Sequence, residues 1–299
     1  MSLKALAKRV KEEQAEREKT VSERFIDEID SYLVKNRNTR YEKEFQYSGF
    51  YIRPSNYYKC MRQIWYKTLR FPSKELFKAK GIRTLEIGTA LHEWVQREVF
   101  MQEDFPFKLI PPEEIPVFGT EGIEIFTKEQ NRLENRPEME IGWVDKRWTK
   151  KYHLYSIIDG ALDVYSVYKL FEFKTINPDD YKYLYEPHDE YKKQSALYSL
   201  SLDIDDTIFL YLNKGNSEWK ALEHHTTEEQ KEWSLNRIQK LDNCLVSLIL
   251  PEKEIQPLPK YGANATACNW CAYQHLCEND VCEAKFKEVN GFMIYDGER

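Results

Sequence analysis

Alternating apolar and polar positions predict a β-hairpin over residues 158–175, near the middle of the chain. The segment is rich in β-branched and aromatic residues, and a short link divides it into two strands. Side chains alternate between the faces of a strand, so Asp159 and Asp163 share one face of the first strand. Glu172 and Lys174 share one face of the second strand for the same reason. A tight hairpin makes these side chains cross-strand neighbours, which places carboxylates and an ammonium group on one patch of sheet.

The chain is long enough for one large domain with additions. Charged, helix-favouring residues with an apolar stripe predict a helical extension that ends near Asn38. The stretch 104–147 is acidic and punctuated by Pro and Gly, which predicts an insertion or lid that ends in a strand. We therefore expect an N-terminal extension over 1–50, a core over 51–250 and a cysteine-rich segment over 251–299.

Local signals predict the other elements of the core. Ser55 is a suitable helix N-cap, which places Cys60 on the helix that follows. Thr227 and Gln230 have the spacing of a capping box at the start of a long helix. The remaining helices are expected over 82–100 and 189–202, the long helix is expected to end near 250, and strands are expected over 139–148, 208–212 and near Trp219.

The composition bounds the location of the protein. No run of about 18 apolar residues occurs, so no membrane-spanning helix is expected. The first residues carry charge instead of an apolar segment, so we expect no signal peptide. The expected location is the cytoplasm, or the host cytoplasm for a phage-encoded protein. Six cysteines in such a reducing compartment indicate metal ligation or free thiols rather than disulfides.

Basic residues are concentrated between positions 53 and 83. The whole chain has a net charge of −6, yet this segment has nine basic residues and one acidic residue, a local charge of +8, so the remainder sums to −14. Aromatic residues lie among the basic ones, and such a mixture can neutralise phosphates and stack bases. The segment predicts either a nucleic-acid contact or an amphipathic helix with aromatic core residues. The candidates for DNA contact are Arg53, Lys59, Arg62, Lys67 and Arg70.

The charged patch on the predicted hairpin has two interpretations. One is an exposed face with solvated charges. The other is a divalent-metal site, because hard cations prefer carboxylate oxygens and Lys174 could orient water and offset phosphoryl charge. Leu170, Phe171 and Phe173 flank the charges and indicate a strand packed on both faces, where unpaired charges are costly.

Two pairs of residues share a helix face. Gly88 and His92 are four positions apart, and so are Gln194 and Tyr198. His92 is either an ordinary histidine or a metal ligand, depending on whether its face meets the hairpin. The amide of Gln194 and the phenol of Tyr198 need polar partners, which the backbone alone could supply.

The most specific spacing lies in the C-terminal segment, where Cys268, Cys271 and Cys277 form a C-x2-C-x5-C pattern. Three clustered thiolates need a fourth ligand to complete a tetrahedral zinc site or a cuboidal iron–sulfur site. The candidates for the fourth ligand are Cys60, Cys244, Cys282 and His275.

In this order, the motifs resemble the RecB-like branch of the PD-(D/E)xK nuclease superfamily. Within that branch the chain looks like the iron–sulfur nucleases of the AddB and CRISPR-associated four-cysteine type. The resemblance covers residues 55–277, about three quarters of the chain. It rests on one cysteine before the core and C-x2-C-x5-C after it, G-x3-H at Gly88–His92, G-x-x-D at Gly160–Asp163, E-x-K at Glu172–Lys174 and Q-x3-Y at Gln194–Tyr198.

The resemblance implies a restriction-endonuclease-like α/β core, a mixed sheet flanked by helices, with a helical iron–sulfur module formed by the N- and C-terminal regions. The implied ligands of a [4Fe-4S] cluster are Cys60, Cys268, Cys271 and Cys277. The implied ligands of Mg²⁺ or Mn²⁺ are His92, Asp163, Glu172 and the carbonyl of Phe173. The implied catalytic residues are Lys174, Glu172, Asp163, Gln194 and Tyr198. Asp159 competes with Asp163 as the metal-binding aspartate, and the glycine context favours Asp163.

The activity implied by the resemblance is metal-dependent exonuclease cleavage at DNA ends, in recombination, repair, or phage or CRISPR DNA processing. An exonuclease is favoured because no separate sequence-reading domain is visible. No phosphate-binding motor motif of the G-x4-G-K-[ST] type occurs, so a helicase or recombination partner would supply any unwinding. The alternatives are a non-catalytic or structure-specific DNA-binding module with a zinc or iron–sulfur site, and an RNA-processing enzyme, since phosphate contacts do not distinguish the sugars.

Overall fold

The computed structural model describes residues 20–47, 51–74, 78–115, 121–257, 265–279 and 284–297. The chain divides into two compact units, one from 1–48 with 77–87 and the other from 49–76 with 88–299. None of the helices in the described ranges combines the length and the hydropathy that a membrane span requires.

The smaller unit contains the helix α2 (Val21–Tyr47) and the first turns of α5 (Ala79–Val95). Arg83 forms an ion pair with Asp30, so charged side chains join the two helices. A helix therefore lies where the pattern predicts the N-terminal extension. It continues to Tyr47, so the predicted end near Asn38 is wrong, and residues 1–19 lie outside the described part of the chain.

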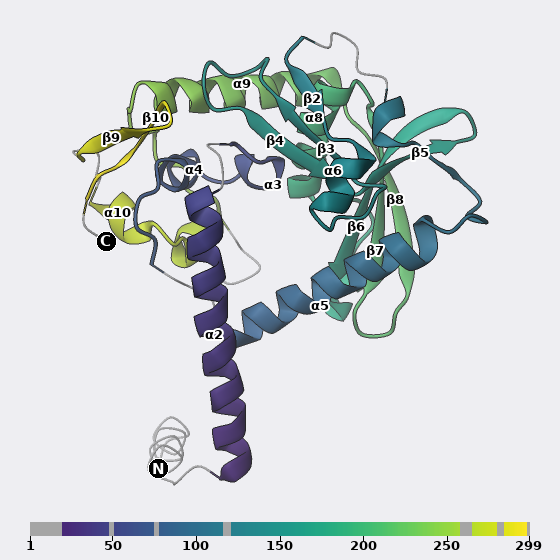
Figure 1. Cartoon of the computed structure of the whole chain (residues 1–299), viewed down its shortest axis with the longest axis horizontal. Coiled ribbons are helices and arrows are strands. Elements are labelled where there is room, and N and C mark those ends of the chain that lie inside the picture. The colour runs from purple at the N-terminus through teal and green to yellow at the C-terminus, as the bar shows by residue number, and fades with distance from the viewer. Residues whose placement is uncertain are drawn as a thin grey trace. The chain divides into compact units, whose positions relative to one another are not determined.

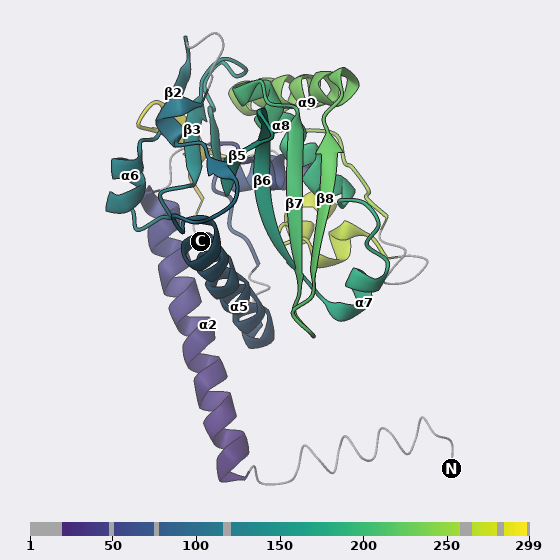
Figure 2. The same ribbon diagram turned by 90° about the vertical axis from the view of Figure 1, so that its right-hand side faces the viewer.

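A five-stranded mixed sheet forms the centre of the larger unit (Figures 1 and 2), in the order β1-β5-β6-β7-β8. Its strands are β1 (Lys108–Leu109), β5 (Gly160–Val164), β6 (Val167–Ile176), β7 (Asp206–Asn213) and β8 (Trp219–His225). β6 and β7 are parallel, and the other neighbours are antiparallel. The helix α8 (Asp189–Leu202) packs through Tyr198 against Leu170, while Val95 of α5 packs with Phe171 and Phe173. Because β6 is buried on both sides in this way, the expected mixed sheet flanked by helices is confirmed.

A second sheet has three antiparallel strands, β2 (Ile123–Ile125), β3 (Ile141–Asp145) and β4 (Leu154–Ile158). The segment 104–147, expected as an insertion or lid, contributes β1 to the main sheet and β2 and β3 to the second. It also contains a short helix, α6 (Lys128–Leu133), which begins with a capping box at Thr127. The segment is therefore part of the sheet architecture, and β3 lies where the strand is predicted.

The predicted hairpin is formed by β5 and β6. Val164 pairs with Val167, so the turn consists of Tyr165 and Ser166, with φ values of 54° and 68°. Two consecutive residues with positive φ are characteristic of a type I′ turn, whose twist matches that of the strands. This turn fixes the register of every cross-strand pair in the hairpin.

The N- and C-terminal parts of the larger unit share one apolar core. Trp65 and Tyr66 of α4 (Met61–Thr68) are fully buried against α9 (Glu228–Val246) and against Tyr273 and Ile294 of the C-terminal segment. The capping box predicted at the start of α9 is present. Cys60 is the N-cap of α4 and Ser55 lies inside the preceding turn, so the predicted N-cap at Ser55 is wrong. The remaining elements are α3 (Pro54–Tyr57), a π-helical turn η1 (Gln96–Phe100), η2 (Pro112–Glu114), α7 (Pro178–Lys182), η4 (Ala267–Trp270), α10 (Gln274–Glu278), β9 (Phe286–Val289) and β10 (Phe292–Tyr295).

Candidate metal centre and cysteine pocket

Asp159 lies where the chain passes from the second sheet to the main sheet, between β4 and β5. In the β3–β4 ladder Ile141 pairs with Ile158, so the next position along the ladder places Glu140 beside Asp159. Gly160 makes this approach possible, because a Cβ there would lie 3.3 Å from the carbonyl oxygen of Met139. The sequence gives no signal that singles out Glu140, which lies at the start of the strand predicted over 139–148, among many other acidic residues of the stretch 104–147.

The β5–β6 ladder brings a second carboxylate to the same point. Gly160 pairs with Phe171, so the next position places Glu172 beside Asp159. The amide of Phe173 donates a 2.6 Å hydrogen bond to Oδ2 of Asp159, which fixes the carboxylate against β6. Lys174, two residues after Glu172, forms an ion pair with it.

His92 completes the site from α5. Its Nε2 lies 2.9 Å from Oδ2 of Asp159, and its Nδ1 lies 3.1 Å from Oε1 of Gln96, which orients the ring. Potential ligand atoms of His92, Glu140 and Asp159 all lie within 4.8 Å of one another, the one such set of three among the described residues. The structure thus brings His92, Glu172 and Lys174 together as the sequence predicts, and adds Glu140.

The site is electrostatically crowded. Burial, with the charge of Asp159, raises the pKa of Glu140 to about 7. Burial also raises the pKa of Glu172 to about 7, although Lys174 opposes the shift. Burial opposes the charge on His92, but Asp159 outweighs it and raises the pKa of His92 to about 9. Three buried or half-buried carboxylates facing one lysine and one histidine form a donor set in which a cation would be stabilised.

Asp163 does not reach this site, which corrects the prediction that it binds the metal. It lies at the turn end of the hairpin, paired with Tyr168, and its Oδ1 accepts a 2.8 Å hydrogen bond from the amide of Ser166. Four positions along a strand separate it from Asp159, about 13 Å at the usual rise. Asp159 lies in the bend before β5 and beside Glu172, whereas Asp163 lies near the other end of β5.

Gln194 and Tyr198 line the back of the site instead of a DNA surface. Tyr198 is 1% exposed and Gln194 is 9% exposed, and the amide of Gln194 donates to the hydroxyl of Tyr198. That hydroxyl donates in turn to the carbonyl of Ile157, 3.0 Å away. Burial raises the pKa of Tyr198, and the neighbouring charge of Glu172 raises it further. The predicted role in holding DNA is therefore wrong, and the pair supports Glu172 from inside the fold.

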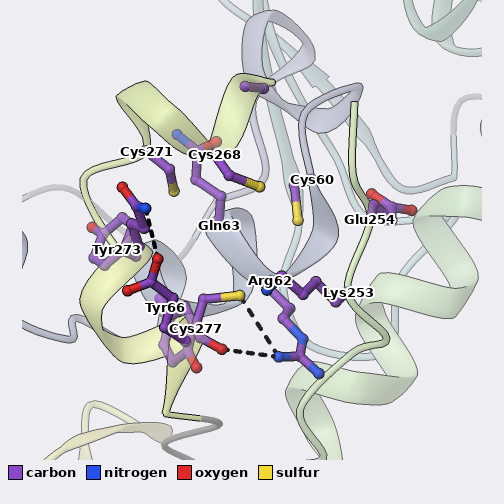
Figure 3. Close-up of a pocket in the computed structure, with 13 residues that line it drawn as sticks. Cys60, Arg62, Gln63, Tyr66, Lys253, Glu254, Cys268, Cys271, Tyr273 and Cys277 are labelled. Atoms are coloured by element: carbon purple, nitrogen blue, oxygen red, sulfur yellow. Dashed lines mark hydrogen bonds between the residues drawn. The ribbon is translucent and has the colours of Figure 1, made fainter. Parts of the chain in front are cut away.

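Four cysteines line one pocket between the N- and C-terminal parts of the larger unit (Figure 3): Cys60, Cys268, Cys271 and Cys277. The pocket encloses about 40 Å³. Burial raises the pKa of Cys271, and the three other thiols raise it further. No three of these sulfur atoms lie within 4.8 Å of one another in the described part of the chain. Zinc–sulfur bonds of about 2.3 Å place tetrahedral ligands about 3.8 Å apart, so the four sulfur atoms are not in the arrangement of a closed zinc site.

The sequence candidates for DNA contact fall into two groups. Arg62 donates to the carbonyl of Pro251 at 2.7 Å and lies 3.6 Å from Sγ of Cys277, so it forms part of the pocket wall (Figure 3), and its contact with DNA stays a prediction. Lys67 is exposed at one end, but the protein atoms packed around its side chain desolvate the ammonium group and lower its pKa. The positive charges of Lys59 and Arg53 lower this pKa further. Arg53, Lys59 and Lys67 therefore form the second group, a set of neighbouring positive charges.

Other candidates lie elsewhere. Arg70 follows α4 with a left-handed φ of 62°. Cys244 is on α9, outside the residues that line the pocket, and its carbonyl accepts a hydrogen bond from the indole of Trp65. Cys282 lies outside the described residues. His275 is on α10, and burial lowers its pKa.

Comparisons with known proteins add little to this geometry. No protein-family model matches the chain, and no curated protein matches it. Six solved chains match, among them the crystal structure of SSO0001. The alignment with SSO0001 covers 86% of this chain and 99% of that chain, with 15% sequence identity and a TM-score of 0.45.

Proposed function

We propose that the protein is a metal-dependent deoxyribonuclease that hydrolyses phosphodiester bonds at DNA ends. The observation that carries the proposal is the meeting of His92, Asp159 and Glu172 with the ammonium group of Lys174 at one point between two sheets. These residues come from a helix, a sheet junction and a strand. A fold that needed only stability would not gather buried carboxylates in this way.

The donor set fits a divalent cation. The residues that would hold Mg²⁺ or Mn²⁺ are His92, Asp159, Glu172 and the carbonyl of Phe173, with Glu140 as a further carboxylate at the same point. Such an ion would polarise the phosphoryl group and lower the pKa of a water molecule. A nitrogen ligand favours Mn²⁺ over Mg²⁺ as the activating ion.

The other residues of the site have distinct tasks. Lys174 is held by Glu172 and lies over the ring of Tyr191, with its nitrogen 5.1 Å from the ring centre. From there it can orient the attacking water and stabilise the charge that develops on the phosphoryl oxygens. The buried pair of Gln194 and Tyr198 keeps Glu172 in position.

Four thiols lining one pocket are donors that an iron–sulfur cluster or a zinc ion accepts, and we propose the cluster because of the resemblance of the cysteine motif. A [4Fe-4S] cluster would join Cys60 to three cysteines of the C-terminal segment. Lys59 is the residue before Cys60, and burial lowers the pKa of its ammonium group although the charge of Glu190 opposes the shift. We propose a structural role for the cluster, in which it holds the start of α4 and the basic residues near it.

The test of the proposed function is cleavage of end-labelled single- and double-stranded DNA by anaerobically purified protein. We expect cleavage with Mn²⁺ or Mg²⁺, none with EDTA, and a loss of roughly 10²- to 10⁴-fold in Lys174→Ala. The matched control is Lys169→Ala, on the same strand but ion-paired with Glu223 away from the site. DNA binding without cleavage under every metal would contradict the proposal and favour the DNA-binding module.

The basic group Arg53, Lys59 and Lys67 gives a second prediction. Because their like charges repel, a DNA phosphate among them would be stabilised by all three. We expect Lys67→Ala to weaken binding of every DNA sequence alike and to reduce the slope of log K against log salt by about 1. The control is Lys146→Ala, whose side chain is paired with Glu124 at 3.7 Å. Equal salt slopes for the two variants would exclude Lys67 from the DNA contact.

A further inference from the structure

Two tryptophans stack on each other at the surface beside the candidate metal centre. Trp94 of α5 and Trp219 of β8 have ring centroids 6.3 Å apart and planes 26° apart. They are 47% and 44% exposed. Neither belongs to the apolar core that Val95 and Phe173 form beneath them.

The pair is connected to the metal centre by a row of rings. The ring of Phe173 lies 6.0 Å from Trp219 and 5.3 Å from the imidazole of His92. Phe173 is 1% exposed, so it fixes the spacing between the surface pair and the site. On β6 its side chain points to the opposite face from those of Glu172 and Lys174, so the row of rings meets the site through His92. The row therefore runs from the reaction centre to solvent.

Trp219 is held in place by its backbone. It pairs with Leu212 at the start of β8, and its carbonyl accepts a 2.9 Å hydrogen bond from the hydroxyl of Tyr181. Trp94 lies in the last turn of α5, close to the π-helical turn that begins at Gln96. Two indoles presented from anchored elements form a pre-organised flat surface, which loses little conformational entropy when a ligand stacks on it.

We propose that Trp94 and Trp219 form a stacking subsite for an unpaired nucleobase, an inference that rests on the proposed nuclease function. A strand whose phosphate lies at His92 and Asp159 must place its adjacent bases near the row of rings. Every nucleobase has a π-face, so an indole surface binds bases without reading sequence. A base inside a duplex is already stacked on both sides, so the subsite selects a base at a frayed or single-stranded end.

The test measures binding of an oligonucleotide of about 12 nucleotides in a Lys174→Ala background with Mn²⁺, so that the strand stays intact. We expect Trp219→Ala and Trp94→Ala each to raise the Kd by roughly 5- to 100-fold. Trp219→Phe, which keeps a ring, should retain most of the affinity. The control is Trp233→Ala, an indole 39% exposed on α9 against Tyr57.

Abasic strands make the test specific for stacking. A strand with an abasic position at the subsite should bind the protein with intact tryptophans more weakly than a complete strand does. In Trp219→Ala the two strands should have the same Kd, because the base and the indole are the two partners of one contact in a double-mutant cycle. Equal weakening of intact and abasic strands in Trp219→Ala, or unchanged Kd in both tryptophan variants, would overturn the inference. Base-dependent binding through the pair by a protein that cleaves no DNA would support the subsite and contradict the nuclease.

Discussion

Asp159→Asn is expected to reduce DNA cleavage by at least about 100-fold, whereas Asp163→Asn is expected to leave it near the wild-type rate. Asp159 is the carboxylate that touches His92 and accepts from the amide of Phe173, so it lies at the centre of the proposed ligand set. Misplacing a ligand by about 1 Å is enough for a 100-fold loss of rate. Asp163 instead caps the hairpin turn through Ser166.

The two substitutions form a matched pair because both replace a carboxylate by an amide of the same size. Asn at position 159 can still accept from the amide of Phe173, so the fold should be retained, which thermal melting would show. Titration calorimetry with Mn²⁺ should show weaker binding for Asp159→Asn only. The opposite result would be a folded Asp163→Asn protein without Mn²⁺ binding or cleavage and an Asp159→Asn protein that is still active. It would show that Asp163, and not Asp159, is the metal ligand.

The strands of the hairpin could be predicted from the sequence, but their register could not. The alternation of side chains correctly predicts the two strands, but Asp159 lies in the bend before β5 and not on a strand face with Asp163. The alternation does not give the register, which depends on the turn. A two-residue turn at Tyr165 and Ser166 pairs 164 with 167 and, counted back, 160 with 171, so Asp159 comes next to Glu172 just beyond the last pair. The sequence predicts the link over Ser166–Tyr168, which is wrong by one residue, because neither Tyr165 nor Ser166 is the Asn or Gly typical of such a turn.

The contact between Glu140 and Asp159 could not be predicted from the sequence for a different reason. It meets Asp159 through the β3–β4 ladder, whose strands are joined by the loop over 146–153. A long loop leaves the register open, so the contact is a property of the folded sheet. The same holds for Tyr198 and Arg62: their helices are recognisable in sequence, but only packing shows that one hydroxyl is buried and that one guanidinium faces Cys277.

Cys277→Ser is expected to lose the iron and the visible absorption of the protein and to melt at a lower temperature, whereas Cys244→Ser should keep all three properties. Cys60 and Cys268 are 208 positions apart. The chain-entropy relation for a covalent cross-link of that loop length gives on the order of 5 kcal/mol, a shift of roughly 10 °C or more. Cys244 is the matched control, because it is a half-buried thiol of the same core outside the pocket.

The Cys277→Ser protein should also bind DNA more weakly, since the cluster would hold Cys60 next to Lys59 at the start of α4. Iron analysis, melting and DNA binding therefore change together if the cluster fastens the basic residues. If the wild-type protein contains stoichiometric zinc and no iron, the proposed cluster is wrong and the cysteines bind zinc. If the wild-type protein contains iron and the Cys277→Ser variant binds DNA with an unchanged Kd, the cluster does not position the DNA-binding residues. Its role would then be only to join the N- and C-terminal parts of the larger unit.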